Sequence, residues 1–398
     1  MTKTVVGLDI GSSHIRGIER VVDKNGDFVI KSVATIKLNE VAIRHGEIID
    51  EDVLVDSLKR LWKEGGFSTQ EVLIGLNGDA TITRVMVLPW EKEFSKILPF
   101  VIEDQNIGIT RAEYYMDHYT LNEFNVEERH GLLSNLVRKK KILFTAIKKE
   151  TVDQYVRVLK AAGLKVISID LAALSLLRSH DWSQDEVTNN GGVNVNVDIG
   201  GTLTTVVISR MNQPIYVRVM PNVGGESITT AIQQELGIPR EQAEELKLKT
   251  GNLSPQPYRR QRRAISIFDE GNSESEIEQI PEQAEPTPEE MIAAGIIATE
   301  ASAIVINVQE TINDYFNRTK ETELGELNKV IISGGLANLK VIMRRLSIEL
   351  EANDVFIGEP FTNLQENGGK INKVSDEIMT NQSEFSIALG LVKSVGVE

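Results

Sequence analysis

One pattern occurs in both halves of this chain and constrains its fold more than any other feature. "VGLDIGSSHIRGIE" (6–19) and "VDIGGTLTTVVI" (197–208) each run from an apolar strand through Asp-Ile-Gly and a polar turn into a second apolar strand. A single Asp-x-Gly is weak evidence for a binding site, because aspartate and glycine commonly support hairpin turns. Repetition of the whole unit, with Asp198 standing where Asp9 stood, predicts a duplicated lobe.

Both turns carry the groups that bind phosphate. Backbone N–H groups and hydroxyls come from Gly11, Ser12, Ser13, Gly200, Gly201 and Thr202. Arg16 would neutralise phosphate charge, and the carboxylates of Asp9 and Asp198 would hold Mg²⁺ through its water molecules. Two such turns facing each other across a cleft predict a nucleoside triphosphate site. The alternative is that each aspartate only supports its hairpin.

Two further glycine pairs stand where a strand gives way to a helix. Gly224 and Gly225 open the helix of "GGESITTAIQQELG", and Gly334 and Gly335 follow the buried strand of "LNKVIISGGLANL". The second pair would let the backbone approach a flat ligand closely. Alone, this glycine pair could equally form an ordinary turn between a strand and a helix.

One charged pair falls on a single helical face. Glu244 and Lys247, in "AEELK", are spaced i, i+3, so both could reach one ribose or base. The alternative is a surface ion pair.

Composition narrows the classes of partner and the compartment. A net charge of −15 and a pI near 5.0 argue against broad attraction to nucleic acid or anionic lipid. The absence of cysteine excludes disulfides and a catalytic thiol, and fits a reducing compartment. We expect no signal peptide in "MTKTVVGLDI". The longest apolar stretch, 291–306, is interrupted by Glu300 and falls short of the roughly 20 residues of a membrane span, so we expect a soluble cytoplasmic protein.

The order of these features resembles the superfamily of actin, heat-shock chaperones and sugar kinases. Its five motifs match here in sequence: phosphate 1 at 6–19, connect 1 at 165–178, phosphate 2 at 195–208, adenosine at 330–339 and connect 2 at 383–395. The resemblance implies an α/β, ribonuclease H-like duplicated fold that binds ATP with Mg²⁺. It also places Arg16 in register with the superfamily's phosphate-binding lysine, and Glu244 and Lys247 in register with its ribose and adenine contacts.

The segment 81–163 is similar to the inserted subdomain 1C of the FtsA and PilM branch. The resemblance implies that 1–80 and 164–190 form subdomain 1A, to which the helix 383–396 returns. Residues 191–222 and 326–382 would then form subdomain 2A. Residues 223–325 would form subdomain 2B, with a mobile loop at 253–289 whose arginines, in "SPQPYRRQRR", we interpret as a solvated patch.

Several stretches resemble the type IV pilus assembly family PilM more closely, among them "LPWEKEFSKILPFVIEDQ", "AAGLKVISIDLAALSLLRS" and "EFSIALGL". The family implies a cytoplasmic adaptor at the inner face of the membrane. It would hold the N-terminal tail of a PilN-like membrane protein in an apolar groove, reaching the membrane only through its partners; other pilus components are possible partners. By resemblance, "ATITRVMVLPW" and "KILFTAI" would line this groove.

Two alternatives remain open at this stage. An FtsA-like division or filament-forming protein is disfavoured because the printed sequence ends in "LVKSVGVE" and not in a basic amphipathic helix. A small-metabolite kinase is disfavoured because no sugar-kinase signature is present. Hydrolysis would need a group that positions water, for which connect 1 offers Ser168 or Asp170, although Asp170 could equally cap a helix. We therefore predict ATP binding, with weak or absent hydrolysis.

Overall fold

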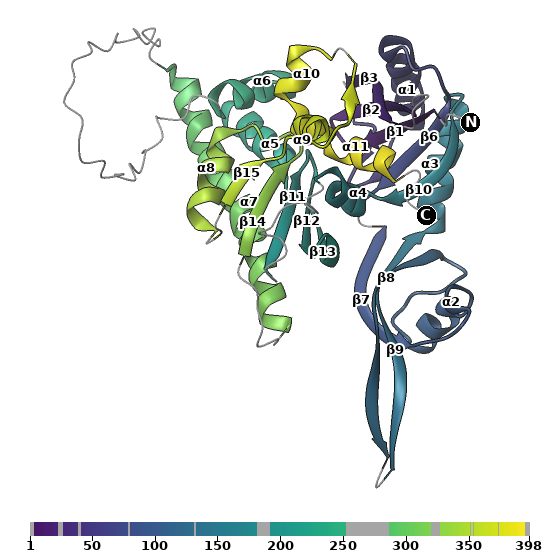
Figure 1. The fold of residues 1–398 in the computed structure, drawn as a ribbon. Coiled ribbons are helices and arrows are strands. Elements are labelled where there is room, and N and C mark those ends of the chain that lie inside the picture. Colours follow the sequence, from purple (N-terminus) through teal and green to yellow (C-terminus); the bar gives the residue numbers. More distant parts are fainter. Residues whose placement is uncertain are drawn as a thin grey trace, which may run out of the picture.

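The structure is a computed structural model, and it has two lobes and a smaller inserted subdomain (Figure 1). It describes residues 4–22, 27–38, 41–78, 80–130, 133–180, 192–251, 286–319, 327–350, 352, 354–372 and 374–394. The loop expected at 253–289 and its arginines lie outside the described residues, except for 286–289; of these, 286 and 287 lead into a helix that already includes 288 and 289.

The first lobe is built on a mixed sheet. In the described part of the chain its strand order is β10-β6-β1-β2-β3-β16. These strands are Lys165–Leu171, Glu71–Leu76, Val5–Ile10, His14–Val22, Phe28–Lys37 and Lys370–Ile371. Strands β10, β6 and β1 run parallel, and β2 and β3 continue antiparallel. A small hairpin, β4 (Ile43–Arg44) and β5 (Glu47–Ile48), precedes helix α1 (Glu51–Gly65), whose first turn is capped by the Asp50 side chain.

The second lobe repeats this sheet. Its order over the described residues is β15-β14-β11-β12-β13, with β15, β14 and β11 parallel and the other two antiparallel. The strands are Asp354–Ile357, Leu327–Ser333, Val193–Ile199, Leu203–Arg210 and Gln213–Pro221. The predicted duplication is therefore confirmed, with β1 and β2 equivalent to β11 and β12.

Strand alternation places both repeated aspartates on the faces between the lobes. Val6, Leu8 and Ile10 of β1 point into the first lobe's own core, so Asp9 points the other way. The odd-numbered residues Val193–Ile199 of β11 enter the second lobe's core in the same manner, which turns Asp198 toward the first lobe.

Two helices, α4 (Ala172–Ser179) and α11 (Ser386–Lys393), lie between the sheets (Figure 1). They share a core with residues of both lobes, including Val5 and Val207. The helices approach very closely, because a Cβ on Gly390 would stand 1.7 Å from the Ser175 carbonyl oxygen. The 3-10 helix η2 (Gln382–Phe385) leads directly into α11.

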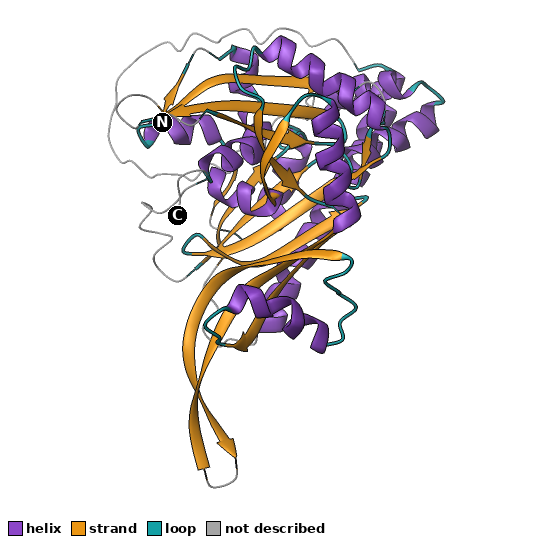
Figure 2. Cartoon of the chain, turned by 90° about the vertical axis from the view of Figure 1, so that its right-hand side faces the viewer, coloured by secondary structure: helices purple, strands orange, loops and turns teal. Residues whose placement is uncertain are grey.

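The inserted subdomain is a sheet with strand order β7-β9-β8 and a single covering helix over the described residues, α2 (Phe94–Asp104). Its strands are Thr81–Pro89, Leu133–Lys148 and Tyr114–His130. Strands β8 and β9 extend well beyond α2 as a two-stranded ribbon (Figure 2). The following helix, α3 (Lys149–Ala161), packs into the first lobe instead, through Tyr155, Val158 and Leu159.

The remaining helices belong to the second lobe and its junction with α11. They are α5 (Gly225–Leu236), α6 (Arg240–Gly251), α7 (Pro288–Thr319), α8 (Lys340–Glu349), α9 (Pro360–Glu366) and α10 (Asp376–Thr380). Helix α7 corrects one expectation, since by length and composition alone it would suffice to cross a membrane. Its apolar residues at i, i+4 spacing, such as Ala293, Ile297 and Ala301, pack into the second lobe's core. Core helices of soluble proteins can meet the same length and composition criteria.

Candidate functional site

The two repeated turns have the same local geometry. Gly11 N–H donates to the His14 carbonyl at 3.0 Å, and Gly200 N–H donates to the Leu203 carbonyl at 2.9 Å. Asp9 pairs in register with Arg16 on β2, and Asp198 pairs in the same way with Thr205 on β12. Because these local hydrogen bonds close each hairpin, neither aspartate is needed to support its turn.

Both turns border one cavity between the lobes. Its walls include most of the residues expected there: Asp9, Gly11, Ser12, Ser13, Arg16, Asp198, Gly200, Gly201, Thr202, Gly334 and Gly335. The turns touch, since a Cβ on Gly201 would lie 2.5 Å from the Ser12 Oγ. The cavity holds about 90 Å³, whereas small-molecule sites span roughly 300–1,000 Å³. The lobes must therefore separate before a nucleotide can enter.

The two aspartates are strongly desolvated. Burial raises the pKa of Asp9 to about 6, against the opposing charge of Arg16. Burial also raises the pKa of Asp198 to about 7, and the neighbouring Asp9 charge raises it further. Among the described residues neither carboxylate has a hydrogen-bond partner, and no cluster of three or more potential ligand side chains surrounds them. This pair fits Mg²⁺, which keeps several waters and takes one or two carboxylates together with phosphate oxygens.

Arg16 is at the expected place, but it already has a partner. Its Nε donates to the Glu384 Oε2 at 3.1 Å, and its Nη2 contacts the same oxygen. Glu384 lies on η2 and lines the cavity. Sequence reasoning searched connect 1 for an acidic group and missed this one in connect 2. The signal was available, because Glu384 precedes α11 by two residues, as Asp170 precedes α4.

The third glycine turn is held tightly against the second phosphate turn. Gly334 has φ +88°, and a Cβ there would lie 2.6 Å from the Ile199 carbonyl oxygen, so a larger residue would push the strands apart. Gly334 N–H donates to the Ser383 carbonyl at 3.2 Å, which ties this turn to η2 beside Glu384.

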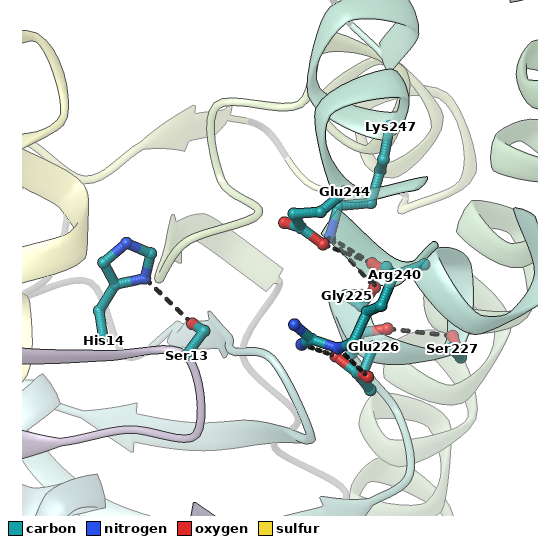
Figure 3. Close-up of polar contacts among 10 residues, drawn as sticks. Ser13, His14, Gly225, Glu226, Ser227, Arg240, Glu244 and Lys247 are labelled. Carbon is teal, nitrogen blue, oxygen red and sulfur yellow. Dashed lines mark hydrogen bonds and ion pairs between the residues drawn. The ribbon is translucent and has the colours of Figure 1, made fainter. Parts of the chain in front are cut away.

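The remaining expected ligand contacts lie beside the cavity and do not line it. Lys247 is buried and donates to Glu244 at 2.7 Å, to the Gly225 carbonyl at 3.2 Å and to the Thr229 Oγ1 at 2.9 Å. Burial lowers the pKa of Lys247 despite Glu244. Figure 3 shows Glu244 on the side of α6 that faces His14 of the first lobe. The pair is therefore internal, and only Glu244 stands toward the gap between lobes.

Gly224 and Gly225 join α5 to the second turn. Gly225 N–H donates to the Gly200 carbonyl at 3.0 Å, and Glu226 N–H donates to the Gly201 carbonyl at 2.8 Å. These two hydrogen bonds fix the turn at Gly200 and Gly201 to the first turn of α5.

The structure does not bring the connect 1 candidates to the cavity. Asp170 accepts from Leu171 N–H at 2.7 Å and forms an ion pair with Arg178, while Ser168 is exposed on β10. Asp170 is also not a helix cap, since Leu171 is the N-cap residue of α4 and no side chain caps that helix. The reason is the direction of β10, an edge strand of the first sheet, which turns this carboxylate toward a second cavity.

Two other residues that line the cavity between the lobes were not expected from the sequence. Asn77, at the end of β6, reaches across the lobes and donates to the Thr205 hydroxyl. Tyr155 of α3 lines the cavity, and its hydroxyl donates to the Gly46 carbonyl at 3.1 Å. Both come from segments whose sequence shows only a strand end and an amphipathic helix.

The second cavity, of about 520 Å³, is a groove between the inserted sheet and the first lobe. Leu143, Thr145 and Ile147 of β9 line it, as expected for "KILFTAI". The expectation for "ATITRVMVLPW" is wrong, because β7 pairs with the far side of β9 and none of its residues reaches the groove. Strand β8 takes its place with Tyr115–Tyr119.

Two sheet edges border this groove. Only alternate residues of β9 line it, as a sheet face requires, whereas consecutive residues do so on β8 and on β10 (Ile169–Leu171). Consecutive residues indicate that the strand backbone itself borders the space. Over the described residues, β8 and β10 are the outermost strands of their sheets on this side.

Helix α3 contributes to both cavities. Val152 lines the groove, and Tyr155, three residues later, lines the cavity between the lobes. At 1.5 Å per residue the two positions are separated by about 4.5 Å along the helix.

The comparisons with known proteins agree with this architecture. The model of the family described as type IV pilus assembly protein PilM matches residues 7–262. The chain belongs to the PilM family. A model of the cell division protein FtsA also matches residues 195–375.

Similar structures cover almost the whole chain. A solved "PilM-PilN type IV pilus biogenesis complex" is 18% identical with a TM-score of 0.73, covering 98% of this chain and 97% of the other. The ethanolamine utilization protein EutJ of Carboxydothermus hydrogenoformans is 13% identical with a TM-score of 0.50, covering 98% and 89%. The PilM-family fold is thus the actin-like, duplicated α/β fold that the sequence predicts.

The chain is also similar in sequence to a cell division protein FtsA. The FtsA cell division protein of Streptococcus pneumoniae serotype 2 (strain D39 / NCTC 7466) is 22% identical over 269 residues, which cover 63% of this chain. The match spans 56% of the relative's own length.

Proposed function

We propose that this PilM-family chain is an ATP-binding adaptor of the type IV pilus machinery, and that its groove holds the N-terminal tail of a PilN-like inner-membrane protein. The groove between β8 and β10 is the observation that carries the proposal. Membership of the PilM family and the likeness to the PilM-PilN complex support a PilN-like partner. The adaptor would then lie in the cytoplasm at the inner face of the membrane, through its partner.

An extended peptide suits the groove best. Unpaired strand edges offer backbone N–H and C=O groups that a peptide strand can pair with, while side-chain pockets provide specificity. The wall between the edges is apolar, with Leu143, Ile147 and Leu174. The ion pair of Asp170 with Arg178 stands at its border and offers polar anchors.

The cleft between the lobes serves the nucleotide in this proposal. Asp9 and Asp198 hold Mg²⁺ through water, the two glycine turns donate N–H groups to the phosphates, and Glu244 faces the nucleoside. The metal neutralises phosphate charge when bound. Since neither Ser168 nor Asp170 lines the cavity, we propose binding with weak or absent hydrolysis.

Fluorescence anisotropy with a labelled peptide from the PilN-like partner tests the groove. Tyr119→Arg puts a charge on a groove side chain that is 44% exposed, and we expect peptide affinity to fall by about tenfold or more. The matched control is Leu136→Arg on β9, 72% exposed and outside the groove. Equal binding by both variants would contradict the proposal.

Methylation of the peptide backbone tests the pairing mode. An N-methyl group removes one N–H donor, so methylation at successive peptide positions should weaken binding alternately if the peptide pairs with a strand edge. Uniform tolerance would mean that only side chains hold the peptide.

The match of the FtsA model to the second lobe favours a second candidate, a filament-forming division protein. Sedimentation with Mg·ATP distinguishes the two. Ordered polymers in the pellet, without peptide binding in the groove, would favour the division protein.

A further inference from the structure

Arg16, the cation at the phosphate turns, is held by a carboxylate in the closed cleft. We propose that Glu384 is an internal substitute for a phosphate group: it occupies Arg16 when no nucleotide is bound, and a nucleotide must displace it. Glu384 then sets how tightly the cleft binds nucleotide and how strongly binding depends on a divalent cation. The inference rests on the proposed nucleotide function and adds a specificity-determining residue to it.

The contact has the geometry of a strong ion pair. Two nitrogens of the Arg16 guanidinium, Nε and Nη2, converge on one Glu384 oxygen. The side chains are 8% and 21% exposed, so little water screens them. Among the described residues, no other ion pair is formed by either group. A phosphate oxygen that approaches Arg16 meets a site already filled by an anion.

The pair also lies where the two lobes meet. Arg16 belongs to β2 of the first lobe, whereas Glu384 lies on η2, next to Ser383, whose carbonyl accepts from Gly334 of the second lobe. Loss of the pair would free Arg16 beside the two phosphate turns, while η2 stays attached to the first lobe through Phe385 and α11. In this proposal, entry of the nucleotide therefore requires loss of the pair.

The acidic side chains of the cavity affect how strongly nucleotide binding depends on a divalent cation. Asp9, Asp198 and Glu384 bring three carboxyl groups against the single guanidinium of Arg16 among the described lining residues. A divalent cation can offset the two aspartates, but Glu384 stays opposed to a polyphosphate in any case. Without the cation the polyphosphate itself carries a larger negative charge, so removal of the Glu384 charge matters most when no metal is present.

A supporting role for Glu384 predicts the opposite result. If the carboxylate only aimed Arg16 at the phosphates, as orienting groups do in many sites, its loss would weaken nucleotide binding. The two roles therefore differ in the sign of one measurement.

The experiment is isothermal titration calorimetry on the full chain with ATP, in Mg²⁺ and separately in excess chelator. Glu384→Gln keeps the side-chain shape and an acceptor oxygen while removing the charge. We expect it to bind Mg·ATP about tenfold more tightly than wild type, with a larger gain in chelator. Glu377→Gln, the same change on the exposed face of α10, is the control and should match wild type.

Thermal unfolding provides a second readout on the same proteins. Without nucleotide, Glu384→Gln should melt at a lower temperature than wild type, because Arg16 loses its partner. With saturating Mg·ATP its rise in Tm should exceed that of wild type.

The outcomes separate the two proposals. If wild type binds ATP and Glu384→Gln binds it equally or more weakly, Glu384 is not a phosphate substitute, while the nucleotide function stands. If wild type does not bind but Glu384→Gln does, the inference is supported in its strongest form. If neither protein binds ATP, the proposed nucleotide function fails and this inference fails with it.

Discussion

The cleft between the lobes and the groove beside the inserted sheet are built on opposite principles. The cleft gathers charged and glycine-rich turns from both lobes around about 90 Å³ of space, and burial raises the pKa of its two aspartates. The groove is larger and is lined mainly by apolar side chains and two strand edges. Closed, charged sites favour small anions with a metal, and open edges favour peptides, which is why we propose a different ligand for each site.

The largest expected difference between the two sites comes from Asp198→Ala. It removes one of two carboxylates available to a metal, so affinity for Mg·ATP should fall by about 100-fold or more. Peptide affinity measured without nucleotide should stay within about twofold, because Asp198 does not line the groove. Calorimetry gives the Mg·ATP affinity and anisotropy gives the peptide affinity, both on one preparation. Unchanged ATP affinity would remove Asp198, and by symmetry Asp9, from the metal site.

The free energy of unfolding of the ligand-free protein should depend on pH. Folded Asp9 and Asp198 keep their protons up to pH about 6 and 7, whereas unfolded aspartate loses its proton near 3.8. The folded chain thus binds more protons over this interval, and the free energy of unfolding should fall as pH rises from about 4 to 7.

Asp198→Asn tests that linkage. The variant should flatten the decline and be more stable than wild type at pH 8 by about 2 kcal/mol, measured by urea unfolding. Asp56→Asn, on a side chain 84% exposed, should keep the wild-type slope. Asp9 alone should leave only the part of the decline below about pH 6, so an undiminished slope in Asp198→Asn would mean that a group other than Asp198 titrates.

Gly224→Ala should have an intermediate effect, again on the cleft alone. Its Cβ would lie 2.5 Å from the Gly201 carbonyl oxygen and 2.7 Å from that of Gly200, and backbone cannot move away cheaply. We expect about a tenfold loss in ATP affinity from the displaced phosphate turn. Gly295→Ala is the control, because nothing lies within 4 Å of that Cβ, and it should slightly stabilise α7.

Asp170→Asn should have the smallest effect and sharpens the boundary between the sites. The residue borders the groove, so ATP affinity and any ATP turnover should remain within about twofold of wild type. Peptide affinity should fall only a few-fold, as expected for a partly exposed polar anchor. Loss of ATP turnover in this variant would restore Asp170 to the nucleotide site.

Sequence reasoning succeeded where the signal is local and repeated. Asp9 and Asp198 could be found because each lies inside a strand-turn-strand unit of a dozen residues, and the repeat of that unit predicted the duplicated lobe. The start of α1 carries a signal of the same local kind, because Asp50 and the i, i+4 leucines after it are neighbours in sequence.

It failed where spatial neighbours are distant in the chain. Glu384 and Arg16 are separated by 368 positions, and nothing near either residue indicates that they pair. The groove was misassigned for a related reason. The segments that became β7 and β9 were both expected to line the groove, but only the sheet order β7-β9-β8 decides which outer strand meets the first lobe.

Helix α3 forms part of the wall of both cavities and so offers a physical link between the two proposed sites. Val152 and Tyr155 sit less than one turn apart on a packed helix, so a shift of α3 that reshapes one site displaces a wall of the other. By linkage, any factor by which nucleotide changes peptide affinity is the factor by which peptide changes nucleotide affinity. A membrane-bound tail in the groove would thereby adjust the nucleotide affinity of a cleft that it never touches.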